Sequence, residues 1–337
     1  MKAIGYIESL AIEEHNALMD IESPKPTASG RDLLVKIAAI AVNPVDCKVR
    51  MRAQPENGQH KILGWDAVGE VVAVGEDVSL FSVGEQVFYA GDLTRQGTNA
   101  EYHLVDERIV GKKPVTISNA EAAAIPLTAI TAWELLFDRL ALQQNKETTK
   151  DILLVTGAAG GVGSILVQLA KTLIAATVIG TASRDESKVW LEKLGVDHVI
   201  DHTKPLKSQL GALGIDAVTH VASLNATDSY FEQFVDILAP FGKLGLIDDP
   251  DTIPINSLKS KSISLHWEFM YTHSMFKTDS MIQQHHLLNQ VSALIDQGKI
   301  RTTLGQHLGL INAKNLRKAH QMLESGCAIG KLVLEGF

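Results

Sequence analysis

Two different periodicities of apolar residues meet in the middle of the chain. Residues 152–155 are a short β-branched and leucine-rich run bounded by turn residues, which is typical of a fully buried strand. Across residues 164–171 the apolar side chains recur at helical spacing, which predicts a helix with one apolar face. A second buried run follows at residues 177–180. Together these segments predict a strand–helix–strand unit.

The same alternation continues toward residue 248. Further buried strands are expected in DHVIDH, IDAVTHVAS and GKLGLIDD, and helices are expected at residues 185–194 and 228–238. Strands and helices that alternate in this way form a doubly wound parallel sheet with helices on both faces. Ligands of such sheets bind beyond the carboxyl ends of the strands.

The segments on either side of this region have a different pattern. The first 120 residues hold short apolar runs broken by Gly, Asp and Pro, which indicate a compact β domain. After residue 264, helices are expected at residues 282–297 and 313–323, and a last strand is expected in GKLVLEGF. The order of these segments indicates that the doubly wound domain is inserted into the β domain.

We therefore expect an α/β protein of two domains, which suits a length of 337 residues. The β domain comprises residues 1–125 and is completed by residues 265–337. The inserted domain comprises residues 126–264. The polar stretch at residues 143–151 is expected to be a loop that leads into the first strand of the inserted sheet.

A glycine-rich loop, TGAAGGVG, joins that strand to the following helix. Glycine lets the backbone turn tightly and approach a phosphate, and a helix N-terminus attracts anions. The spacing Gly-x-x-Gly-x-x-Gly is a relaxed form of the dinucleotide fingerprint, and the alternative is an ordinary tight turn. The residues expected to cradle a pyrophosphate are Ala158, Gly160, Gly161 and Val162.

The next strand ends without the acidic residue that an NAD site usually carries. Ser183 and Arg184 follow this strand directly, and Lys188 lies four residues after Arg184. Cations bind phosphate through charge-assisted hydrogen bonds, so these residues favour the 2′-phosphate of NADP(H). The alternative is a solvated first helical turn. The ends of the later strands supply three further candidate cofactor neighbours, His202, Ser223 and Ile247.

Composition excludes several classes of protein. A net charge of −8 argues against a nucleic-acid binder. No apolar run is long enough to span a membrane, and the amino-terminal residues do not resemble a secretory signal. The two cysteines cannot form a disulfide framework, so we expect a reducing, cytoplasmic setting.

The order of the domains, with AAGGVG at the cradle, resembles the medium-chain dehydrogenase/reductase superfamily over essentially the whole chain. The nearest likeness is to its zinc-free quinone oxidoreductases of the zeta-crystallin type. The segments that carry it are AVNPVDCKVR, GWDAVGEVVAVG, AAAIPLTAITAWELL and GKLVL. LHWEFMYTHSMF resembles a subgroup called zinc-type alcohol dehydrogenase-like. The resemblance implies a GroES-like β domain with an inserted Rossmann domain.

Zinc members of this superfamily hold the catalytic metal with three Cys, His or carboxylate ligands. At the matching positions this chain has Asn43, Trp65 followed by Asp66, and Thr128. No metal is therefore expected. Cys47 supplies only one thiol, and the adjacent His285 and His286 are expected to be exposed to solvent.

The resemblance also implies roles for individual residues. Asn43 and Thr128 match contacts of the nicotinamide side, Trp65 would form an apolar wall, and Asp46 would orient the Asn43 loop. Four further positions match residues near the cofactor, which are His202, Ile247, Phe269 and Lys331. At position 202 the family often has tyrosine. Residues 244–267 match the strand through which zinc-free members form homodimers.

We therefore expect an enzyme that transfers hydride from NADPH to a small-molecule quinone or similar conjugated carbonyl. One alternative is an NADPH-dependent enone or alkenal reductase. Another is a non-catalytic NADPH-binding sensor or structural protein. The glycine loop also resembles that of short-chain dehydrogenases, but none of the five tyrosines has the lysine four residues later that their catalytic pair requires.

Overall fold

The computed structural model describes residues 1–56, 58–144 and 150–337. The chain forms two compact units. The first consists of Met1–Ile130 and Tyr271–Phe337, and the second of Thr131–Met270. Part of the expected loop at residues 143–151 lies outside the described residues.

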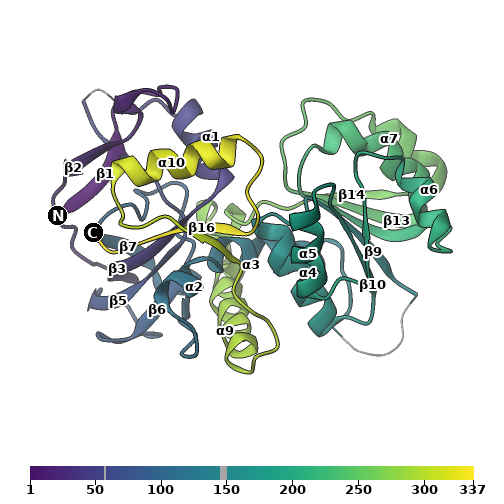
Figure 1. The fold of residues 1–337 in the computed structure, drawn as a ribbon. Helices are drawn as coiled ribbons and strands as arrows, with labels where there is room; N and C mark the ends of the chain where they lie inside the picture. Colours follow the sequence, from purple (N-terminus) through teal and green to yellow (C-terminus); the bar gives the residue numbers. More distant parts are fainter. Residues whose placement is uncertain (57, 145–149) are drawn as a thin grey trace. The chain divides into compact units, whose positions relative to one another are not determined.

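The first unit is built on a mixed, largely antiparallel sheet in the order β15-β16-β3-β5-β6-β8, with β7 also paired to β3. These strands are Leu304–His307, Lys331–Glu335, Asp32–Val42, Ala67–Val74, Gln86–Tyr89, Val110–Lys112 and Tyr102–Asp106, in that order. A smaller sheet, in the order β2-β1-β4, comprises Met19–Glu22, Lys2–Tyr6 and Lys61–Ile62. The C-terminal strand β16 lies antiparallel beside β3 (Figure 1).

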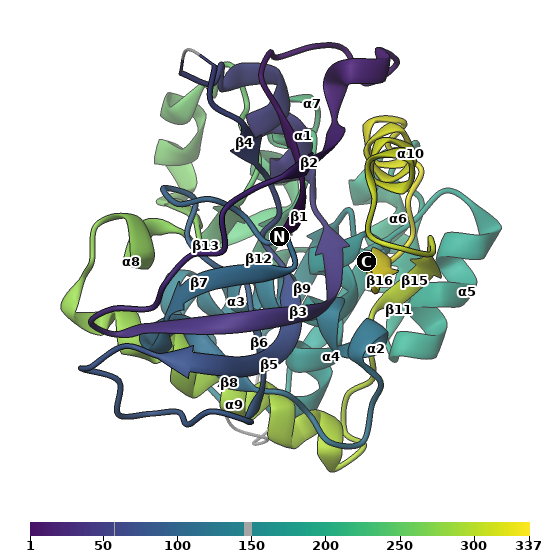
Figure 2. The same cartoon turned by 90° about the vertical axis from the view of Figure 1, so that its left-hand side faces the viewer.

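The helices of the first unit include α1, which packs against α10 near the carboxyl end of the chain (Figures 1 and 2). The helices are α1 Pro44–Arg52, α2 Asn119–Ala123, α8 Thr272–Met275, α9 Gln283–Asp296 and α10 Ala313–Glu324. Helix α3, Pro126–Trp133, runs across the boundary of the two units and continues as a π-helical turn at Glu134–Arg139. Pro126 begins α3, so the apolar stretch AAAIPLTAITAWELL forms two helices.

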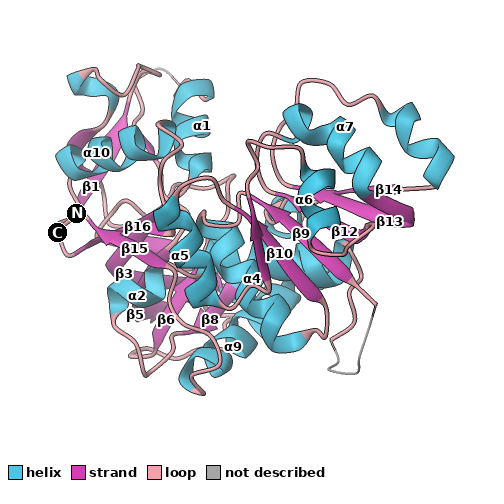
Figure 3. Cartoon of the chain, turned by 45° about the vertical axis from the view of Figure 1, so that its right-hand side comes forward, coloured by secondary structure: helices cyan, strands magenta, loops and turns pink. Residues whose placement is uncertain are grey.

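The second unit is a sheet in the order β11-β10-β9-β12-β13-β14, and its neighbouring strands run parallel. The strands are His198–Ile200, Thr177–Thr181, Ile152–Thr156, Val218–Ser223, Leu238–Leu246 and Ser264–Trp267. The helices are α4 Gly161–Leu173, α5 Asp185–Leu194, α6 Leu206–Ala212 and α7 Thr227–Ile237, and they lie on both faces of the sheet (Figure 3). This confirms the predicted doubly wound α/β fold.

The burial of apolar side chains explains why the segments of the second unit form these strands and helices. Strand β9 is covered on both faces, as its uniform apolar run predicts. Helix α4 buries Ile165, Leu166 and Leu169 against the sheet. Helix α5 ends at Gly195, whose φ of +88° is readily adopted by glycine.

Among the described residues, α2, α3 and the π-helical turn together form one stretch, Asn119–Arg139, that has the length and apolar composition of a membrane span. Its most apolar window is 89% buried, which is the pattern of a core helix.

The expectation that His285 is exposed is wrong. His285 lies on the buried face of α9, between the sheet and the helix, whereas His286 is exposed. The Nδ1 atom of His285 is 2.6 Å from the Val110 carbonyl oxygen, and Nε2 is 3.0 Å from the Asn289 amide nitrogen. His285 is three residues before Leu288, which shares its helix face and is also buried.

Candidate functional site

A buried group of four side chains forms the polar centre of the first unit. We call Asn43, Asp46, Asp66 and Lys331 the polar cluster; all are at most 3% exposed. Asn43 is the N-cap of α1, and its backbone N–H donates to Asp46 Oδ2 over 2.8 Å. Proline follows Asn43 as the first helical residue, where its missing N–H costs nothing. The sequence Asn-Pro-x-Asp therefore fixes the start of α1.

Asp66 is the hub of this polar cluster. Its Oδ2 accepts hydrogen bonds from the Asn43 amide and from the Lys331 ammonium, each over 2.8 Å. Its Oδ1 accepts from the Leu127 backbone N–H, also over 2.8 Å. Lys331 donates in addition to the Asn43 side-chain oxygen. The Asn43 amide is thus held from both ends.

Burial sets the electrostatics of the two carboxyl groups. It raises the pKa of Asp46 to about 7, against the opposing effect of the Asn43 backbone N–H and the Lys331 charge. It also raises the pKa of Asp66, while Lys331 pulls that pKa down. The cluster therefore holds one cation, which binds Asp66, and a second carboxyl group, Asp46, whose pKa the Asp66 charge raises further.

Two aromatic side chains lie next to the polar cluster. The Trp65 indole N–H donates to the Asp92 carbonyl oxygen over 3.2 Å. Its ring meets that of Tyr271 edge-on, with centroids 6.4 Å apart. Burial and the charges of Asp46 and Asp66 raise the pKa of Tyr271 well above its usual range, so its hydroxyl is protonated at neutral pH. Tyr271 is not among the site residues predicted from the sequence, although it lies in LHWEFMYTHSMF.

Thr128 lies one residue after the Leu127 N–H that binds Asp66. It is buried, and its hydroxyl donates to the Ile125 carbonyl oxygen over 3.0 Å. Of the predicted site residues, the structure therefore joins Asn43, Asp46 and Lys331 through hydrogen bonds. Trp65 directly precedes Asp66 in the chain, and Thr128 directly follows Leu127, whose N–H binds Asp66.

The glycine-rich loop connects β9 to α4 in the second unit. Gly157 has φ of +64°, which favours glycine. A Cβ at Gly163 would lie 2.4 Å from the Ala158 carbonyl oxygen, so only glycine allows the helix to pack this closely. Gly160 is the N-cap of α4, whose first N–H groups have no intrahelical partner. The loop therefore fits a pyrophosphate at the helix N-terminus.

The other predicted cofactor residues of the second unit follow the carboxyl ends of its strands. Ser183 is half-buried after β10, and Arg184 is exposed and precedes α5. Lys188 pairs with Asp185 over 3.1 Å at the surface. The Ser223 hydroxyl is buried 2.8 Å from that of Thr227.

Three more predicted cofactor residues follow β13, β11 and β14, and none of them is fully buried. The Ile247 backbone N–H donates to the Ser223 carbonyl oxygen over 3.3 Å. The His202 ring is half-buried and meets the Tyr230 ring edge-on at 6.4 Å. Phe269 is 49% exposed.

Comparison with known proteins places this architecture in a family. Residues 29–115 match the family model of the alcohol dehydrogenase GroES-like domain, and residues 194–334 match that of zinc-binding dehydrogenases. A zinc-type alcohol dehydrogenase-like protein of Staphylococcus aureus is 41% identical, over 99% of both chains. The chain belongs to the medium-chain dehydrogenase/reductase superfamily.

Two further relatives support this membership. A crystal structure of a presumed zinc-dependent alcohol dehydrogenase from Rhizobium etli is 51% identical, with a TM-score of 0.96 over 100% of this chain and 98% of that one. The mitochondrial NAD(P)H oxidoreductase RTN4IP1 of Danio rerio is 28% identical, over 90% of this chain and 83% of the relative.

Several of these names mention zinc, but the side chains at the matching positions do not suit it. A catalytic zinc takes thiolate, imidazole or carboxylate ligands. Asn43 and Thr128 offer an amide and a hydroxyl, and Trp65 offers no ligand atom. Asp66 alone has a suitable group, and its carboxylate already binds the Lys331 ammonium. The residues at these positions therefore do not fit a catalytic zinc.

Proposed function

We propose that this protein is a zinc-independent oxidoreductase that transfers a hydride from NADPH to a quinone or to a similar conjugated carbonyl compound. The observation that carries the proposal is the Asp66–Lys331 ion pair, whose side chains are at most 3% exposed. A divalent cation bound at Asp66 would meet the ammonium of Lys331, and two cations repel each other strongly in a buried site.

The chemistry of the substrate follows from this. Oxidation of an alcohol needs a group that stabilises the developing alkoxide, commonly a metal ion. Reduction of a conjugated carbonyl does not need such a strongly stabilising group, because the negative charge spreads onto oxygen and water can supply the proton. The nicotinamide provides the hydride, and the task of the protein is to bind and orient the two reactants.

We assign the polar cluster the task of positioning Asn43. Asp46 fixes the backbone of Asn43, and Asp66 with Lys331 fixes its amide. In this proposal Asn43 and Thr128 contact the nicotinamide side of the cofactor, and Trp65 supplies an apolar wall. Lys331, predicted near the cofactor phosphates, acts here through Asn43, because its ammonium is engaged within the polar cluster.

The second unit would hold the rest of the cofactor. The pyrophosphate would bind the β9–α4 loop, and the 2′-phosphate would bind Ser183, Arg184 and Lys188. Further cofactor contacts are proposed for His202, Ser223, Ile247 and Phe269. The support for NADPH over NADH is the absence of a carboxylate at the end of β10 together with these nearby cations.

We also propose that two copies pair through β14. This strand ends the sheet order of the second unit, and Trp267 on it is 50% exposed. An edge strand with an exposed aromatic side chain suits pairing with a second copy. Sedimentation of wild type and Trp267→Lys would test this, because the charge should shift the protein from dimer to monomer; a wild-type monomer would refute it.

The experiment for the activity is a screen of NADPH consumption with quinones, enones and alkenals, each with and without a chelator. We expect the protein to consume NADPH in the presence of quinones, with a kcat that the chelator leaves unchanged. Turnover confined to enones or alkenals would establish the alternative reductase activity. Tight NADPH binding without turnover of any of these compounds would instead indicate a sensor or structural protein. Loss of turnover with chelator, restored by zinc, would refute the zinc-independent proposal.

A further inference from the structure

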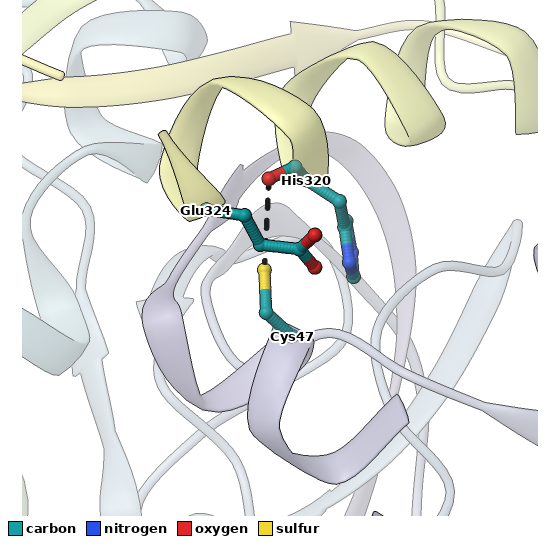
Figure 4. A group of neighbouring side chains, drawn as sticks. All are labelled: Cys47, His320 and Glu324. Atoms are coloured by element: carbon teal, nitrogen blue, oxygen red, sulfur yellow. Dashed lines mark hydrogen bonds between the residues drawn. The ribbon is translucent and has the colours of Figure 1, made fainter. Parts of the chain in front are cut away.

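Helices α1 and α10 bring three potential metal ligands together away from the polar cluster. Cys47 lies on α1, and His320 and Glu324 lie one turn apart on α10. Their ligand atoms, the thiol sulfur, an imidazole nitrogen and a carboxylate oxygen, all lie within 4.8 Å of one another (Figure 4). Among the described residues, these three form the group of His, Cys, Asp or Glu side chains whose ligand atoms lie close enough together to hold a metal ion.

His320 gives an independent reason to expect a ligand here. The side chain is fully buried, and neither ring nitrogen has a hydrogen-bond partner in the described structure. A neutral imidazole has one donor and one acceptor nitrogen, and each costs free energy when it is buried without a partner. Figure 4 shows the ring beside the Glu324 carboxylate, with the Cys47 sulfur on the other side of that carboxylate. A ring nitrogen of His320 lies within 4.8 Å of both other ligand atoms.

We propose that Cys47, His320 and Glu324 form a binding site for a divalent transition-metal ion of the zinc type. Thiolate, imidazole and carboxylate together match the ligand preferences of Zn²⁺ and exclude Mg²⁺ and Ca²⁺, which prefer oxygen ligands. Three protein ligands leave a fourth position for water. The site is separate from the catalytic position that the zinc enzymes use, and it does not depend on the proposed hydride transfer.

The surroundings are compatible with metal binding. Burial and the Arg50 charge lower the pKa of His320 to about 3, so its imidazole is neutral and carries a lone pair. Burial raises the pKa of the Cys47 thiol above its usual range, so the metal must displace a proton. The reaction is M²⁺ plus Cys–SH giving Cys–S–M⁺ plus H⁺. The buried Arg50 guanidinium pairs with one oxygen of Glu324, so the second oxygen would bind the metal. The Cys47 thiolate and the Glu324 carboxylate together offset the two charges of the ion, whereas at Asp66 a single carboxylate would face both the ion and Lys331.

Only small movements are needed to form the site. Zinc–sulfur and zinc–nitrogen bonds of about 2.3 and 2.0 Å place tetrahedral ligands about 3.5 Å apart. The present separations of up to 4.8 Å must therefore shorten by about 1 Å. The Glu324 side chain is 28% exposed, so this ligand contacts solvent while the other two are buried. The bound ion would clamp α1 to α10.

The test uses Co²⁺ as a spectroscopic probe of the untagged full chain, treated with chelator and kept reduced with a non-thiol reductant. The chain has two cysteines, so Cys327→Ser leaves Cys47 as its only thiol. We expect a thiolate-to-cobalt charge-transfer band in Cys327→Ser that saturates at one equivalent and disappears when Zn²⁺ is added. Because this variant changes an exposed residue, the result does not depend on a variant that could misfold.

Ligand variants then identify the other members of the site. Cys47→Ser should lose the charge-transfer band, and His320→Gln should weaken Co²⁺ binding by at least about tenfold. Metal should raise the unfolding temperature of wild type and Cys327→Ser, but not that of Cys47→Ser. Absence of a thiolate band in Cys327→Ser would overturn the proposal. If His320→Gln bound Co²⁺ with the same affinity as wild type, the assignment of this three-ligand site would likewise be overturned.

Discussion

Replacing Lys331 with methionine removes an ammonium group from the polar cluster and keeps a side chain of similar length. Asp66 then remains buried, and among the described residues its remaining hydrogen-bond donors are the Asn43 amide and the Leu127 N–H. Removing one partner of a buried ion pair costs about 3–5 kcal/mol, because the other charge is left uncompensated. We expect Lys331→Met to lower the free energy of unfolding of the first unit by that amount.

The double variant separates this effect from simple loss of packing. In Asp66→Asn with Lys331→Met, neither charge remains to be buried alone. We therefore expect the double variant to lose less stability than the sum of the single variants, with a coupling energy of about 3 kcal/mol. The surface pair Lys112–Glu85 has the same 2.8 Å separation but a 60% exposed lysine, so Lys112→Met should change stability by less than about 0.5 kcal/mol.

Urea unfolding can report on this unit alone. Trp65 is the only tryptophan in Met1–Ile130 and Tyr271–Phe337, so its fluorescence follows the first unit once the other three tryptophans are replaced by phenylalanine. Equal costs for Lys331→Met and Lys112→Met would refute the reasoning. So would strictly additive losses in the double variant, because the two charges would then not interact.

Three further predictions concern other parts of the chain. Burial lowers the pKa of His103 from 6.5 to about 4, so its contribution to stability is complete above pH 6.5 and is lost as the pH falls toward 4. We expect a loss of about 3 kcal/mol across this range that His103→Gln abolishes, measured by urea unfolding at each pH. Arg184→Ala should weaken NADPH binding about 10- to 150-fold in titrations and leave NADH nearly unchanged; equal losses would contradict a 2′-phosphate contact. Gly163→Ala should destabilise the second unit by about 1–3 kcal/mol, because the new Cβ meets the Ala158 carbonyl at 2.4 Å. Gly211→Ala, at an open helical position, is the control and should not destabilise it.

Local patterns were sufficient to predict much of the fold. The helix expected at residues 185–194 is α5, because acidic residues occupy its first turn and Gly195 ends it. The helix expected at 228–238 is α7, one residue earlier at each end. In both cases one apolar face packs on a sheet, and this face is visible in the sequence.

The contacts of the candidate sites could not be predicted in the same way. Lys331 and Asp66 are 265 residues apart, and Cys47 and His320 are 273 residues apart. These pairs meet only because β16 joins β3 and α10 packs on α1, and no local periodicity encodes such contacts. His285 shows the related difficulty that a polar residue on a buried helix face resembles a surface residue until its partners are known.

Completion of the first unit by its last strand has a consequence for synthesis on the ribosome. Asp66 emerges early, whereas Lys331 emerges only after all of Thr131–Met270. During that interval the second unit can already fold, while Asp66 has no counter-ion and β3 lacks its neighbour β16. Nascent chains stalled before residue 331 should therefore expose the first unit to proteases and chaperones while protecting the second.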